Sequence, residues 1–95
     1  MANYKLEVIL RGTFTTIDIR LEGIEIQLVQ KDNAYHYKLY NNFNIINPLD
    51  ISVRLKGWEG MQWSLEIKVE DIKIYEENST FDHKGYVEYS TAIDI

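Results

Sequence analysis

The sequence predicts an all-β domain, an antiparallel β-sandwich, with a small flattened β-barrel as the alternative. Three observations predict this fold: apolar residues recur at every second position in segment after segment, each segment is short, and turn-forming residues separate the segments. About seven to nine short strands fit this spacing, as in a sandwich or a small barrel. The connections are too short for the crossovers that parallel strands require, so we expect antiparallel pairing.

The first strands follow from a regular alternation of apolar and polar residues. Residues 4–11 alternate in this way, with only Ile9 interrupting the polar face, and residues 15–21 repeat the pattern. The pair Glu22-Gly23 predicts a two-residue hairpin turn, because glycine readily adopts a positive φ. Residues 24–28 then form the third alternating segment.

In the middle of the chain, residues 31–33 predict a turn, since Asp and Asn side chains bond to nearby backbone groups. A strand follows, in which the side chains expected to face inward are Tyr35, Tyr37 and Leu39. The polar face of the same strand is expected to carry His36, Lys38 and Tyr40. Turn-forming residues delimit a further short segment at 43–46, and residues 51–56 alternate again.

Residues 61–70 are the one stretch in which a helix is a real alternative. Leu65, Val69 and Ile72 lie at helical spacing. Apolar residues also occupy every second position throughout this stretch, and the β-branched residues among them favour a strand. We therefore expect a central strand here, followed by a bulge or tight bend at Asp71.

The C-terminal part is predicted to contain a long exposed loop and the last strand. Residues 76–85 are the longest polar stretch, and residues 86–95 return to a strand pattern. No repeat, linker or low-complexity segment interrupts the chain, so residues 1–95 are expected to form a single domain.

Composition excludes several classes of function. The chain has no cysteine, which excludes disulfides, thiolate metal sites and a cysteine nucleophile. The net charge of −5 is spread along the chain without a basic stripe, so a nucleic-acid partner is not expected. No apolar run approaches the roughly 20 residues that a membrane-spanning helix needs, and without a secretory signal the cytoplasm is the expected compartment. A composition rich in Asn and Ile, with Lys used more often than Arg, indicates an AT-rich bacterial or viral genome.

The side chains offer little support for catalysis or for metal binding. The two histidines, His36 and His83, are far apart in the sequence and lack the spacing of a zinc site. The serines have no nucleophile motif and no neighbouring base. We therefore expect no enzyme activity, no metal and no cofactor.

The two tryptophans are expected to play different parts. Trp63 alternates with Leu65 and is predicted to lie in the core. Trp58, followed by Glu59, lies between glycines in a predicted loop, where a large exposed apolar side chain is unfavourable unless something covers it. Trp58 is expected either to fold back and cap the end of the sandwich or to mark a contact surface.

Tyrosines form the second candidate surface. The chain has seven of them, and three lie in one strand with a histidine: Tyr35, Tyr37 and Tyr40 with His36. On an outer face, such residues resemble the surfaces on which sugar rings stack. Tyrosine is also common in protein interfaces and in strands, so packing accounts equally well for many of these residues.

These features predict a non-catalytic interaction module that docks on a protein partner through an edge strand or through the Trp58 loop, as part of an oligomer or a larger assembly. One alternative is a carbohydrate-binding module that uses Trp58 and surface tyrosines. The other is a β-barrel that binds a small ligand in an internal cavity.

Overall fold

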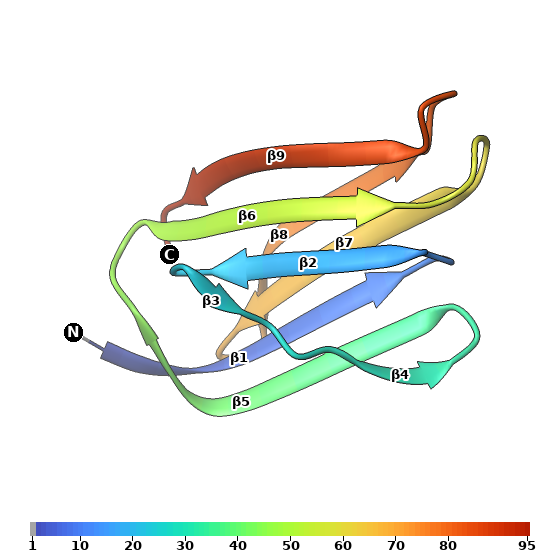
Figure 1. Cartoon of the computed structure of the whole chain (residues 1–95). Helices are drawn as coiled ribbons and strands as arrows, with labels where there is room; N and C mark the ends of the chain where they lie inside the picture. The colour runs from blue at the N-terminus through green and yellow to red at the C-terminus, as the bar shows by residue number, and fades with distance from the viewer. Residues whose placement is uncertain (1) are drawn as a thin grey trace.

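Two antiparallel sheets pack face to face in the computed structural model, which describes residues 2–95 (Figure 1). Within this range, the larger sheet has the strand order β4-β5-β1-β7-β8, and the smaller sheet has the order β3-β2-β6-β9. The strands are β1 (Ala2–Arg11), β2 (Thr16–Leu21), β3 (Ile24–Glu25), β4 (Val29–Asp32), β5 (Tyr35–Ile45), β6 (Leu49–Lys56), β7 (Gln62–Val69), β8 (Ile72–Thr80) and β9 (Tyr86–Ile93). The predicted antiparallel sandwich is confirmed, and the two sheets do not join into a flattened barrel.

The core lies between the two sheets and is built from strands whose side chains alternate between buried and exposed. β6 and β7 show this alternation along their whole length. The side chains at the centre are almost all aliphatic and are completely or almost completely buried, among them Leu6, Val8, Leu10, Ile19, Val53, Leu55, Leu65 and Ile67. Each such side chain contributes about 1.5–3 kcal/mol on removal from water. The strand predicted at residues 61–70 is therefore a central strand of the larger sheet, and the helix is excluded.

Two tight turns have the backbone geometry that the sequence predicts. Glu22 and Gly23 have φ values of 55° and 75°, and their strands close at the pair Leu21–Ile24. Positive φ at both central residues gives a turn whose twist matches the twist of the flanking strands. Glu70-Asp71 forms a second turn of this kind between β7 and β8, with a register shift just before it. The predicted bend at Asp71 is thus confirmed.

The predicted facing of β5 was wrong. In the register of β1 with β5, His36 lies opposite Leu10, and Tyr40 lies opposite Leu6. Directly opposed residues share a face of an antiparallel sheet, so His36 and Tyr40 face inward while Tyr35 and Tyr37 face outward. Apolar or aromatic residues stand at both odd and even positions here, so the alternation could not identify the buried face.

The bounds of β5 also differ from the prediction. β5 continues through Asn41 and Asn42 to Ile45, and a register shift against β1 changes which face its side chains occupy. Phe43 and Ile45 are therefore buried, although they are odd-numbered like the outward-facing Tyr35. A bulge of this kind adds one residue to a strand and has no clear signature in the sequence.

Two predicted turns lie at different positions. The turn after β4 is formed by residues 33–34, not 31–33, although Asp32 does accept a hydrogen bond from the Ala34 N–H at 3.0 Å. The predicted loop at 76–85 begins only at Phe81, since β8 extends to Thr80. Residues 76–80 are polar because they belong to an edge strand, and such strands keep charged and polar side chains.

Candidate functional site

Trp58 stands on the loop that joins β6 to β7, at the end of the sandwich where the β8–β9 loop also lies (Figure 1). The residue is 54% exposed, so it does not fold back over the end of the core. The neighbouring Glu59 is exposed as well. Of the two alternatives for Trp58, the structure therefore favours an accessible side chain.

The backbone of this loop is held in place by the neighbouring loop. The Gly57 N–H donates to the Gly85 carbonyl at 3.0 Å, and the Gly60 N–H donates to the Phe81 carbonyl at 2.9 Å. The Phe81 N–H donates in turn to the Met61 carbonyl at 3.0 Å. Both sides of the Trp58 loop are thus tied to the β8–β9 loop, which limits the backbone motion of the loop between them.

The buried side chain of Phe81 packs against the Trp58 loop at Gly57. Phe81 is only 2% exposed, and its ring packs so closely on Gly57 that a side chain at position 57 would overlap it. Three exposed large side chains lie in or next to these two linked loops: Trp58, Met61 and Tyr86, here called the Trp58 platform. The Lys56 ammonium lies over the Tyr86 ring, 5.8 Å from its centroid, and so places a positive charge at this end of the sandwich.

His36 is part of the core and not of a binding surface. It is 8% exposed, and its ring lies 5.8 Å from the Phe14 ring in an edge-to-face arrangement. The Nδ1 atom has no hydrogen-bond partner among the described residues. The structure thus separates His36 from the surface on which the sequence placed it.

The sequence pattern did not predict that Phe14 and Phe81 take part in this region. The Phe81 ring lies 6.0 Å from Phe14 and 6.3 Å from Trp63, so the three rings and His36 close this end of the core. Phe14 lies between β1 and β2, and Phe81 follows β8. Both lie in polar, turn-like segments, where the alternation of apolar and polar residues gives no indication of burial. The glycines that make room for their rings are the only signal the sequence offers.

The candidate tyrosines are divided between the two faces of the larger sheet. Tyr35 and Tyr37 are neighbours on the outer face, with ring centroids 6.3 Å apart. Tyr37 donates a hydrogen bond of 2.6 Å to Glu7, and this bond, with smaller contributions from burial and charge, raises the pKa of Tyr37 to about 12. Tyr40 faces the other way and packs on Phe43, with ring centroids 5.2 Å apart. The four candidates in β5 are therefore not brought together into one site.

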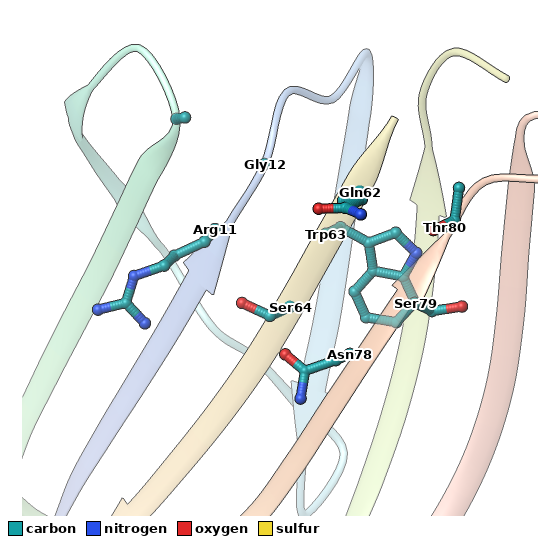
Figure 2. A pocket seen from close by; sticks show the side chains of 9 residues that line it. Arg11, Gly12, Gln62, Trp63, Ser64, Asn78, Ser79 and Thr80 are labelled. Atoms are coloured by element: carbon teal, nitrogen blue, oxygen red, sulfur yellow. The ribbon is translucent and has the colours of Figure 1, made fainter. Parts of the chain in front are cut away.

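A polar groove of about 640 Å³ lies next to Tyr35 on the larger sheet (Figure 2). Its lining combines the Trp63 indole, Gly12 and Ala34 with hydroxyl, amide and guanidinium side chains: Arg11, Gln62, Ser64, Asn78, Ser79 and Thr80. Arg11, Ser64 and Asn78 form a row, because they lie directly opposite one another in β1, β7 and β8. Such a row presents donors and acceptors in one plane.

Arg11 is held in this groove by an aromatic ring. Its guanidinium lies 5.2 Å from the centroid of Tyr35, a contact that orients the side chain at little entropic cost. Among the residues that the structure describes, no carboxylate lies within ion-pair distance of Arg11. The guanidinium is therefore available to a ligand.

Over residues 2–95, no three histidine or carboxylate side chains gather closely enough to hold a metal ion. The same range contains no helix with the length and apolar character needed to cross a membrane. Comparisons with models of protein families, with curated proteins and with solved structures found no match to the chain.

Proposed function

We propose that the chain is a non-catalytic binding module that makes protein–protein contacts through the Trp58 platform. The observation that supports this proposal is a tryptophan that is 54% exposed on a loop tied by backbone hydrogen bonds to its neighbour. Tryptophan is among the residues most enriched at the energetic centres of protein interfaces.

The fixed loop also makes binding more favourable. A partner that contacts Trp58 does not have to order the loop backbone, so less conformational entropy is lost on association. The platform combines an aromatic anchor with a flexible, adaptable methionine and a tyrosine, which is a common composition for a protein-binding surface.

The platform is a better candidate than the sheet edges. The edge strands β4 and β8 also carry exposed apolar residues, of which Ile72 is the most exposed at 66%. Charged residues accompany these side chains, with Lys31 and Asp32 in β4 and with Lys73 and Glu76 in β8. Charges on an edge strand oppose pairing with another strand, so these edges are protected against strand addition.

Self-association is the first test, since a second copy of the chain is a partner that purified protein supplies. Sedimentation velocity from micromolar to millimolar concentration is expected to show a dimer that Trp58→Ala weakens. Ile72→Ala is the matched control, because it removes an even more exposed apolar side chain at the opposite end of the sandwich. A photo-crosslinking amino acid at position 58 extends the test to other proteins. A chain that stays monomeric and forms no specific adduct from position 58 would contradict the proposal.

A second candidate function is carbohydrate binding at the polar groove of Figure 2. The observation that favours it is the row of hydroxyl and amide side chains beside the Arg11–Tyr35 stack, since sugars are bound through stacking and through planar arrays of hydrogen bonds. A glycan array with wild type and Tyr35→Ala tests it, with Tyr86→Ala as the control for loss of an exposed tyrosine elsewhere. Absence of glycan binding, or equal binding by both variants, would exclude this function. The ligand-binding barrel is not proposed further, because the two sheets remain separate.

A further inference from the structure

The polar groove of Figure 2 contains a cationic side chain that no carboxylate of the described chain neutralises. The chain has three arginines. Arg20 lies 3.2 Å from a carboxylate oxygen of Asp18, and this pair is exposed on the smaller sheet. Arg54 lies 3.1 Å from a carboxylate oxygen of Glu88. Arg11, the arginine of the groove, is therefore the one without an anionic partner over residues 2–95.

The carboxylates nearest to the groove are already engaged. Glu66 and Glu76 lie two residues away from the row in β7 and β8, and lysine side chains contact them at 3.7 Å and 3.3 Å. Asp32, opposite Tyr35 in β4, accepts a hydrogen bond of 3.0 Å from a backbone N–H. The guanidinium is thus the charge of this surface that a ligand can still balance.

The placement of Arg11 suits a carboxylate. The residue is exposed, and the Tyr35 ring, with its centroid 5.2 Å from the guanidinium carbon, orients the planar group. A carboxylate accepts two parallel hydrogen bonds from such a group. A phosphate carries more negative charge and is opposed more strongly by the net charge of −5. A ligand with a single carboxylate therefore fits the groove better than a phosphorylated one.

The rest of the row suits the hydroxyl groups of a sugar. Ser64 lies opposite Arg11, and Asn78 lies opposite Ser64. Directly opposed residues have Cβ atoms about 4.5–5.5 Å apart, so a hydroxyl and an amide follow the guanidinium at intervals comparable to the width of a sugar ring. Both groups donate and accept hydrogen bonds, as sugar hydroxyls do. A sugar with a carboxylate at one end and hydroxyls at the other matches this order.

We propose that the groove selects acidic sugars. The sugar carboxylate pairs with the Arg11 guanidinium, and the ring hydroxyls form hydrogen bonds with Ser64 and Asn78. This selectivity rests on the carbohydrate binding proposed for the groove and adds the chemical class of the sugar. It does not depend on the Trp58 platform.

Proton–nitrogen NMR titrations with three sugars that differ at one carbon test the selectivity. Methyl galacturonoside carries a carboxylate there, its methyl ester carries a neutral ester, and methyl galactoside carries a hydroxymethyl group. The galacturonoside is expected to shift the backbone signals of Arg11, Ser64 and Asn78 saturably. It should bind about ten-fold more tightly than either neutral sugar, the effect of one charge-assisted contact. A capped tripeptide with one glutamate, which offers a carboxylate without a sugar ring, should bind more weakly than the galacturonoside.

Arg11→Gln and Arg54→Gln form a matched pair of variants. Both remove one positive charge from an exposed arginine, but Arg54 lies in β6 of the smaller sheet. Arg11→Gln is expected to weaken galacturonoside binding about ten-fold while Arg54→Gln leaves it unchanged. Arg11→Lys retains the charge but not the planar group, so it should keep only part of the affinity. The backbone spectra of all three variants show whether the fold is intact.

The possible results separate the selectivity from carbohydrate binding itself. If the acid and its ester bind equally, or if Arg11→Gln and Arg54→Gln weaken binding equally, the selectivity is overturned. Carbohydrate binding then still stands, provided that Tyr35→Ala weakens it. If the tripeptide binds as tightly as the galacturonoside, the groove recognises carboxylates and not acidic sugars. If none of the three sugars binds, carbohydrate binding fails and the selectivity fails with it.

Discussion

The hydroxyl oxygens of Tyr75 and Tyr89 lie 2.7 Å apart, so one hydrogen bond links the edge of the larger sheet to the edge of the smaller one. Both residues face the interior, since Tyr75 lies opposite the buried Ile67 and Tyr89 lies opposite the buried Val53. Burial raises the pKa of Tyr89, and the bond to Tyr75 raises it further. The bond thus joins β8 to β9, the same two strands that the loop at residues 81–85 connects at one end of the sandwich.

Removal of either hydroxyl is expected to destabilise the sandwich. Tyr75→Phe and Tyr89→Phe should each lower the free energy of unfolding by about 0.5–1.5 kcal/mol, the usual contribution of a hydrogen bond, and the double variant should lose little more than one of them. Urea denaturation measures all three. Tyr86→Phe is the control, because its hydroxyl bonds to the exposed Glu88. Fully additive losses would show that the two hydroxyls do not interact.

The Tyr37–Glu7 hydrogen bond predicts a pH dependence at high pH. It raises the pKa of Tyr37 from its usual value of 10.0 to about 12. Because the folded value is the higher one, the contribution of this group to stability is complete below about pH 10 and is lost as the pH rises through about 12. In an absorbance titration of the phenolates, Tyr37→Phe should remove one ionisation near pH 12, while the late ionisation of other tyrosines with a raised pKa, such as Tyr89, remains.

Two carboxylate variants test the cause of this shift. Glu7→Gln is expected to lower the pKa of Tyr37 toward 10.0, because the charged acceptor is gone. Glu66→Gln removes a carboxylate from the same face without breaking the bond to Tyr37, so it should change the titration little. If Glu7→Gln leaves the late step in place, the hydrogen bond is not its cause.

The outer strands show where the sequence is informative about the fold and where it is not. Alternation identified the buried face of β6 and β7 because their two faces differ clearly in polarity. β5 carries aromatic residues on both faces and contains a register shift, so its facing depends on tertiary pairing with β1. The burial of His36 could therefore be predicted only from the pairing of β5 with β1.

The candidate sites depend even more on tertiary structure. Trp58 was recognisable, because a tryptophan between glycines in a loop is unusual on any fold. The polar groove brings β1 together with the β7–β8 hairpin, which is distant from β1 in sequence, and a second hollow lies between β8 and β9, which belong to different sheets. These residues come together only through the order of the strands in the sheets. The periodicity of apolar residues in the sequence does not specify that order.

His36 is expected to act as a packing residue whose polar character contributes nothing to stability. His36→Leu keeps most of the volume and removes the unpaired Nδ1, so the free energy of unfolding should stay within about 1 kcal/mol of the wild-type value or rise. His36→Ala leaves a cavity beside Phe14 and should lower it by about 2–4 kcal/mol. A strongly destabilised His36→Leu protein would instead indicate that the imidazole makes a necessary polar contact.

The contact of Gly57 with Phe81 should be a requirement for the Trp58 platform. A Cβ at position 57 would lie 2.8 Å from the Cδ2 and Cζ atoms of Phe81, a ring that is buried and has no room to move away. Gly57→Ala is therefore expected to lower the free energy of unfolding by about 1–3 kcal/mol and to change the fluorescence of Trp58. Gly60→Ala is the control in the same loop, because its Cβ meets nothing within 4 Å and its effect comes only from a φ of 83°.

A double-mutant cycle with Phe81→Leu separates these two effects, because the smaller side chain makes room at position 57 but does not change φ at position 60. The loss caused by Gly57→Ala should become smaller in the Phe81→Leu background, whereas the loss caused by Gly60→Ala should stay the same. Equal losses for Gly57→Ala in both backgrounds would mean that the loop is not supported by the Phe81 ring. The conformation of the Trp58 loop would then depend on its backbone hydrogen bonds, because the atoms nearest to a Cβ at position 57 all belong to Phe81.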